Sequence, residues 1–173
     1  EVYDKYGDYT AEVAFFIEQV TGHIIPDFRP VLACGLNRII SELEQKIEKE
    51  TDAVKKDNFA AMKLTLQSVI GLAERYAQIA SEQKQTATGV RAKQLELMES
   101  TLRKVPMYGC DTLYEAIQSY MLLWQVMCLE QAPNPFAFSV GNADRIFEPY
   151  RAKENLSRED AAALLKHLLV FYN

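Results

Sequence analysis

Apolar residues recur every three or four positions along most of the chain, which is the spacing of one face of an α-helix. The only run that favours a strand is 136–140, and it is short and flanked by proline and glycine. The pattern therefore predicts a mostly α fold, a bundle-like set of helices with at most one or two short strands around 136–140. The expected helices are centred on 13–20, 31–47, 59–76, 90–102, 113–130 and 157–171.

Residues with known roles at helix ends indicate where several of these helices begin and end. Gly22 is a natural stop after the first helix, and Asp52 follows Thr51 as a cap for the third. Asp111 or Thr112 is expected to cap the helix over 113–130. That helix is apolar on every side at 120–124, which predicts that it is buried on all sides, as a central element of a larger protein would be.

Length, charge and cysteine content narrow the classes of protein further. The chain has 173 residues and a net charge of −5, and its basic residues are scattered, which argues against a nucleic-acid partner. Its longest uncharged run, 116–129, is too short to cross a bilayer, and no signal peptide is visible. Three cysteines without a Cys-x-x-Cys spacing predict neither a disulfide framework nor a zinc site. We therefore expect one cytoplasmic domain over 1–173, cut at both ends from a longer protein and without a metal.

Few residues offer catalytic chemistry. His23 lies in a loop between Gly22 and a proline, from which it can reach a cleft, although a structural role fits the spacing as well. Cys110 precedes a helix N-terminus, where the helix dipole could lower its pKa, but a structural role is the preferred interpretation of this thiol. Cys34 and Cys128 lie on apolar helical segments and are expected in the core. His167 is expected at the surface or at the edge of the core.

Three stretches in order along the chain resemble one family. The first is Gly22-His23-Ile24-Ile25-Pro26-Asp27-Phe28, and the second is Val105-Pro106 followed by Thr112-Leu113-Tyr114-Glu115-Ala116. The third is Ser139-Val140-Gly141-Asn142-Ala143-Asp144, which ends in Pro149-Tyr150. Together they resemble the glycyl radical enzymes of the pyruvate formate-lyase-like group, which includes diol dehydratases and formate C-acetyltransferases.

The resemblance implies a fold and a chemistry for the intact enzyme. Such enzymes are α/β barrels wrapped in helices, in which a stored glycyl radical generates a cysteine thiyl radical that takes a hydrogen atom from a small substrate. An activase with S-adenosylmethionine and an iron–sulfur cluster installs the glycyl radical. The cysteine loop (Gly-Cys-x-Glu) and the glycyl loop (Arg-Val-x-Gly-Tyr) of the family are both missing from this sequence.

The chain is therefore expected to be an N-terminal portion of an anaerobic bacterial lyase, dehydratase or acyltransferase that is not catalytically competent alone. It would supply no catalytic residue and bind no cofactor itself. The expected partners are a small-molecule substrate in the intact enzyme, the radical-activating enzyme and a second copy of the chain.

By the same resemblance, the substrate-binding residues are His23, Phe136, Ala137, Phe138 and Ser139. Many dehydratases have His-Ser where this chain has Phe136-Ala137, and an arginine where it has Asn142. The loss of polar groups at 136 and 137 favours an apolar or cationic substrate over a diol, since an aromatic ring can hold a quaternary ammonium. After this segment the chain is expected to turn at Gly141 into a short helix that Pro149 closes.

Two alternatives from other classes stay open. The chain fits a non-catalytic helical scaffold or interaction module if an apolar stripe is exposed and no cavity lies near His23 and Phe136. It fits an independent hydrolase only if a histidine lies close to the Cys110 thiol.

Overall fold

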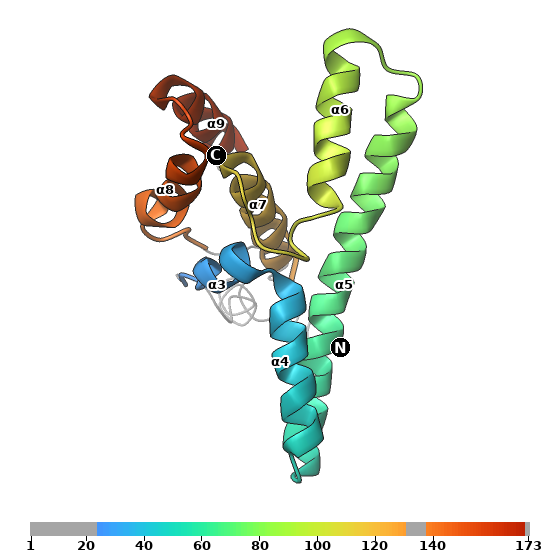
Figure 1. The fold of residues 1–173 in the computed structure, drawn as a ribbon. Coiled ribbons are helices and arrows are strands. Elements are labelled where there is room, and N and C mark those ends of the chain that lie inside the picture. The colour runs from blue at the N-terminus through green and yellow to red at the C-terminus, as the bar shows by residue number, and fades with distance from the viewer. Residues whose placement is uncertain (1–23, 131–137, 172–173) are drawn as a thin grey trace, which may run out of the picture.

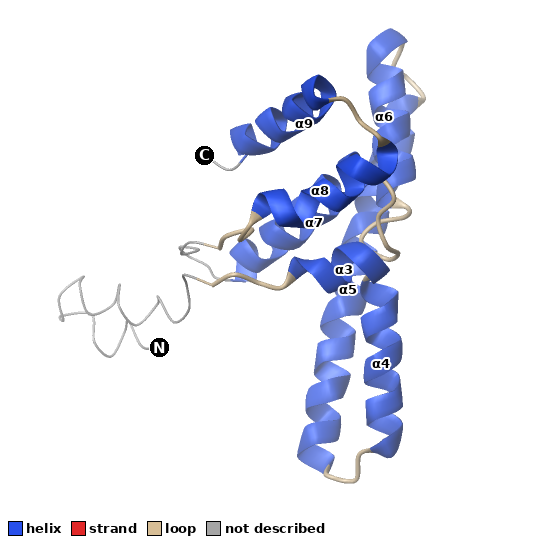
Figure 2. Cartoon of the chain, turned by 60° about the vertical axis from the view of Figure 1, so that its left-hand side comes forward, coloured by secondary structure: helices blue, strands red, loops and turns tan. Residues whose placement is uncertain are grey.

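The computed structural model describes residues 24–130 and 138–171, and within these ranges it contains seven helices and no strand. Figures 1 and 2 show an elongated hairpin of long helices beside a group of shorter ones. The mostly α prediction is confirmed. The helices are α3 (Phe28–Cys34), α4 (Leu36–Lys49), α5 (Ala53–Lys84), α6 (Gly89–Leu102), α7 (Leu113–Glu130), α8 (Ala143–Glu154) and α9 (Arg158–Phe171).

The longest helix, α5, has two neighbours along its length. The helix α4 packs against its first half and α6 against its second half, so the α4–α5 hairpin projects away from α7, α8 and α9 (Figures 1 and 2). Small buried residues on α5, Ala73, Ala77 and Ala80, recur at helical spacing and allow close approach of the neighbouring helices. Leu102 of α6 and Leu122 of α7 join Ala73 and Ala77 in one apolar cluster.

The helix predicted over 31–47 is divided in two at Gly35, and the prediction of one continuous helix is therefore wrong. Gly35 has φ 79° and ψ 168°, a conformation that only glycine adopts readily. The 105–110 loop crosses the chain at this point. The backbone N–H of Leu36 donates to the Pro106 carbonyl (2.8 Å) and that of Cys110 to the Leu32 carbonyl (2.8 Å). These long-range hydrogen bonds replace those of a continuous helix.

Tyr120 of α7 is the centre of the larger apolar core. Its side chain is fully buried, with edge-on contacts to Phe28 of α3 (ring centroids 4.8 Å apart) and to Phe147 of α8 (5.8 Å). Buried residues of α9, Ala161 and Leu168, complete the cluster. The helix α7 thus has neighbours on several sides, but it is not buried on all sides as predicted: Leu123 and Trp124 are half-buried and Leu129 is exposed.

The α5 helix begins at the predicted cap. One carboxylate oxygen of Asp52 accepts hydrogen bonds from the N–H groups of Val54 (2.9 Å) and Lys55 (3.2 Å). Replacing Asp52 by Ala is expected to lower the free energy of unfolding by about 1 kcal/mol, because two N–H groups of the first turn lose their acceptor. Thr88, the cap residue of α6, makes no side-chain cap bond in the described structure, so Thr88→Ala is the matched control. Equal losses in urea denaturation of the two variants would contradict the role of Asp52.

Ion pairs fasten the start of α7 to its surroundings. Lys104 Nζ lies 2.6 Å from Asp111 Oδ2 and 2.6 Å from Glu115 Oε2. Hydrogen bonds from Lys104 and Lys153 lower the pKa of the Asp111 carboxyl to about 2. Lys153 of α8 also pairs with Asp111. Glu154 at the end of α8 accepts a hydrogen bond from the Leu113 N–H (3.1 Å), so α8 caps α7 from 41 residues away.

One expectation for the segment after α7 differs from the structure. The described part of the candidate strand, 138–140, is a loop, which agrees with the prediction of at most one or two short strands. Pro149 does not close α8 but lies within it, on an exposed side, and the helix ends at Asn155 in the left-handed conformation (φ 50°). An exposed proline removes one helical hydrogen bond where solvent can replace the missing donor, and α8 continues past it.

Candidate functional site

The first and third of the family-like segments lie side by side. The backbone N–H of Ser139 donates to the Ile24 carbonyl (3.1 Å), which joins chain segments 115 residues apart in the sequence. The indole Nε1 of Trp124 on α7 donates to the Phe138 carbonyl (3.1 Å), which attaches the loop before α8 to α7. We call the contact of 24–28 with 138–144 the segment junction.

Local chemistry shapes each side of the segment junction. The Ser139 hydroxyl accepts a hydrogen bond from the Gly141 N–H (3.0 Å) and closes a tight turn before α8. Gly141 has φ 79°, and a Cβ there would lie 2.9 Å from Cγ2 of Ile25. On the other side, Phe28 anchors the start of α3 in the core. The junction is therefore held by a local turn on one side and by an anchor in the core on the other.

A hollow of about 330 Å³ opens at the segment junction. One wall comes from the residues before and within the start of α3, and the other from the turn and first residues of α8. Its charged lining residues are Asp27, Arg29 and Arg145, and its apolar ones include Ile25, Val140 and Ile146.

The charges of the hollow are partly paired. Arg29 Nε lies 2.8 Å from Asp27 Oδ1, and Arg29 Nη2 lies 3.3 Å from Asp27 Oδ2. This hydrogen-bonded pair lowers the pKa of the Asp27 carboxyl and raises that of the Arg29 guanidinium. Arg145 has no ion pair with any residue of 24–130 or 138–171.

The substrate-binding residues predicted from the sequence are placed only in part. His23, Phe136 and Ala137 lie outside the described residues. Phe138 is buried, and Ser139 is exposed with its hydroxyl engaged in the turn to Gly141. Their role in substrate binding stays a prediction. Arg29 and Arg145 were not among the predicted site residues, and nothing in the local sequence distinguishes them from other surface arginines.

The cysteines agree only in part with their predicted states. Cys110 is buried, as a structural residue would be, and burial raises the pKa of its thiol to about 12, so the helix dipole does not activate it. The Cys110 N–H donates to the Leu32 carbonyl of α3, which holds the backbone there. Cys34 and Cys128 were expected in the core, but Cys34 is exposed and Cys128 is half-buried. His167, as predicted, is at the surface, where it contacts the Phe171 ring.

The burial of the cysteines and the raised pKa of Cys110 predict the order in which the thiols react. At pH 7.5, iodoacetamide is expected to modify Cys34 at least about 100-fold faster than Cys110, because only the thiolate reacts and Cys110 is buried with a raised pKa. Mass spectrometry of tryptic peptides over time measures both rates. A Cys110 rate equal to that of Cys34 in the folded protein would show that the thiol is accessible, and labelling in urea provides the unfolded reference.

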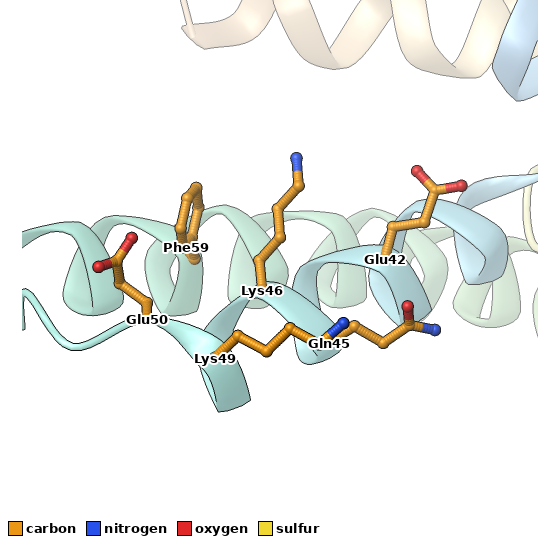
Figure 3. A pocket seen from close by; sticks show the side chains of 6 residues that line it. All are labelled: Glu42, Gln45, Lys46, Lys49, Glu50 and Phe59. Atoms are coloured by element: carbon orange, nitrogen blue, oxygen red, sulfur yellow. The ribbon is translucent and has the colours of Figure 1, made fainter.

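Two further hollows lie away from the segment junction. The larger, about 460 Å³, lies between the second half of α4 and the start of α5. In Figure 3 the Lys46 side chain extends past the Phe59 ring, between Glu42 and Glu50, and Lys46 Nζ is 5.8 Å from the ring centroid. Its walls are long charged side chains of a solvated hairpin, which is typical of a surface groove. The third, about 240 Å³, lies among α6, α7 and α9.

The described residues contain no group of His, Cys, Asp or Glu side chains that could hold a metal ion. None of the described helices has the length and hydropathy of a membrane-spanning segment. The described residues thus form a helical unit with a small charged hollow where two family-like segments meet.

Comparison with known proteins agrees with this class of fold. Residues 4–173 match the pyruvate formate lyase-like family, and the chain therefore belongs to that family. No curated protein sequence matches it.

Several solved structures share its fold. A structure described under 1,2-propanediol dehydration in Roseburia inulinivorans is 26% identical, with a TM-score of 0.77 over 86% of this chain and 20% of that one. The B12-independent glycerol dehydratase of Clostridium butyricum is 23% identical, with a TM-score of 0.77 and the same two coverages, 86% and 20%. The hydroxyproline dehydratase of Clostridioides difficile is 24% identical, with a TM-score of 0.77 over 97% of this chain and 24% of that one. The chain thus spans about a fifth to a quarter of the length of these similar structures.

Proposed function

We propose that this chain is the N-terminal helical portion of a glycyl radical enzyme and that its segment junction forms one wall of a small-molecule pocket. The observation that carries the proposal is the hydrogen bond from the Ser139 N–H to the Ile24 carbonyl. It joins residues 24–28 to residues 138–144, which directly follow the predicted substrate-binding residues His23, Phe136 and Ala137 in the sequence. Substrate-binding residues from distant parts of a chain must converge in this way to line one pocket.

The portion is proposed to be inactive alone. The family chemistry requires a thiyl cysteine and a glycyl loop, and neither motif occurs in these 173 residues. Cys110 is buried in the core and not in a loop that reaches the hollow. In the intact enzyme, the radical-activating enzyme would install the glycyl radical, and this chain's part would be to position the substrate and exclude water. The reaction is proposed to be a lyase, dehydratase or acyltransferase reaction, in a cytoplasmic, anaerobic setting.

The test of inactivity is an activation assay without oxygen. The 173-residue protein is incubated with a glycyl radical activase, S-adenosylmethionine, a reductant and 1,2-propanediol or glycerol. We expect neither a glycyl radical signal in electron paramagnetic resonance nor any product. A complete glycyl radical enzyme, treated identically with its own activase, shows that the assay works. A radical signal and turnover from this chain would overturn the proposed inactivity.

A second candidate, an interaction module, is favoured by the surface of α9. Leu165, Leu169, Val170 and Phe171 are exposed there, beside the hollow among α6, α7 and α9. Exposed apolar groups gathered on one helix are typical of a surface that another protein covers. We propose that copies of this chain associate through this α9 face.

Self-association has a direct measurement. Sedimentation velocity at rising protein concentration is expected to show dimers or larger species, and Leu169→Glu is expected to shift them toward monomer. Val54→Glu on α5 is the matched control, since Val54 is equally exposed (70%, against 65% for Leu169) but far from α9. A monomer at all concentrations, or equal effects of both variants, would contradict association through the α9 face.

A further inference from the structure

The hollow at the segment junction carries an excess of positive charge. Its lining contains the guanidinium groups of Arg29 and Arg145 and one carboxylate, that of Asp27. Arg29 and Asp27 neutralise each other at 2.8 Å. Arg145 is left with no ion pair among the described residues, so the lining holds one uncompensated positive charge.

Part of the lining is apolar. Ile25, Val140 and Ile146 contribute hydrocarbon groups, and Gly141 lets the Ile25 side chain approach the turn, since a Cβ at 141 would lie 2.9 Å from Cγ2 of Ile25. A ligand in this hollow would therefore meet a guanidinium as well as methyl and methylene groups. This arrangement matches a molecule with one charged end and a short hydrocarbon part.

The first turn of α8 adds donors to the same wall. Helical hydrogen bonding begins with the Ile146 N–H, which donates to the Asn142 carbonyl (3.1 Å), so the preceding N–H groups have no acceptor within the helix. Asn142 makes no side-chain cap bond in the described structure. The helix dipole also favours a negative charge at this end. These features favour the binding of an anion, but the main evidence is the unpaired Arg145 guanidinium and the volume of the hollow.

We infer that this hollow binds a short-chain monocarboxylate, with Arg145 as the residue that holds the carboxylate. One net positive charge balances a monoanion and leaves a dianion such as phosphate underneutralised. A volume of about 330 Å³ suits a ligand of a few carbon atoms. A cationic substrate, which the aromatic residue Phe136 favours, would be repelled here. The inference rests on the hollow alone and stands whether or not the chain belongs to a radical reaction.

The experiment is a titration of the folded 173-residue protein with butyrate, followed by ¹H–¹⁵N NMR at low ionic strength. Butyrate is expected to shift the amide signals of 140–146 saturably, while butyramide, choline and inorganic phosphate each bind at least about tenfold more weakly. Butyramide has the same shape without the charge, so it isolates the contribution of the carboxylate.

Variants assign the binding to Arg145. In Arg145→Gln the dissociation constant for butyrate is expected to rise about tenfold or more, because a charge-assisted hydrogen bond is lost. Arg91→Gln changes an exposed arginine of α6 and the net charge equally, so it is expected to leave the constant unchanged. The inference is overturned if butyrate gives no saturable shift, if phosphate or butyramide binds equally well, or if both variants weaken binding alike. Unchanged spectra of Arg145→Gln outside 140–146 verify that it is folded.

Discussion

Gly35→Ala is expected to lower the free energy of unfolding by about 3 kcal/mol or more. The φ of 79° and ψ of 168° at Gly35 lie in a region that is nearly closed to residues with a Cβ, at a cost of about 1–3 kcal/mol. A Cβ there would also lie 2.3 Å from the Met107 carbonyl oxygen and 2.4 Å from Cα of Tyr108. Because these are backbone atoms, they cannot rotate away as the end of a side chain can. The added methyl group therefore forces the 105–110 loop to shift.

Chemical denaturation of two matched glycine variants measures this effect. Gly89 also has a positive φ (59°), but a Cβ there would have no atom within 4 Å. Gly89→Ala therefore carries the backbone strain alone and is expected to cost about 1 kcal/mol. The difference between the two variants reports the contact with the 105–110 loop. If Gly35→Ala loses no more stability than Gly89→Ala, the loop does not press on Gly35 as the structure shows.

The second large effect is expected at the centre of the core. Tyr120→Ala should lower the free energy of unfolding by about 3–5 kcal/mol, because it removes a fully buried aromatic ring and leaves a cavity. The ring contacts Phe28 of α3 and Phe147 of α8, which are the elements that carry the two walls of the hollow. The variant is therefore expected to loosen the segment junction as well.

Tyr76→Ala is the control for Tyr120→Ala. Tyr76 lies on α5 with half of its surface exposed, so the same truncation is expected to change stability by no more than about 0.5 kcal/mol. Thermal unfolding followed by circular dichroism compares the two. NMR signals of 140–146 show whether the junction changes in Tyr120→Ala. A loss below about 1 kcal/mol at Tyr120 would mean that the ring does not support α3 and α8 together.

The sequence alone determined most of the secondary structure and the family. The helix over 113–130, the Asp52 cap and the start of the last helix after Ser157 were all predicted, and the structure confirms them. The signals involved act within one or two turns: apolar spacing, side-chain oxygens that accept from nearby N–H groups, and charges suited to the helix dipole. The family-like segments were also readable, because each is a continuous run of residues.

The candidate site was predictable only in pieces. The sequence marked 22–28 and 139–144 through their resemblance to the family, and the hydrogen bond between Ser139 and Ile24 agrees with their juxtaposition. The roles of His23, Phe136 and Ala137 stay predictions, since these residues lie outside the described part. Arg29 and Arg145 were missed, because a surface arginine becomes notable only once the charges around it are known.

Tertiary structure decided the features that depend on distant contacts. The helix breaks at Gly35 because a loop 70 residues later occupies the path of the chain, and no local signal near 35 contains that information. Cys110, at the end of that loop, is buried where its backbone bonds to α3, and Cys34, on an apolar helical segment, is exposed. Pro149 remains inside α8 because its missing donor lies on an exposed side and the buried side of the helix packs on α7. Local sequence thus determined which segments are helical, and packing determined where they break and which side chains meet at the hollow.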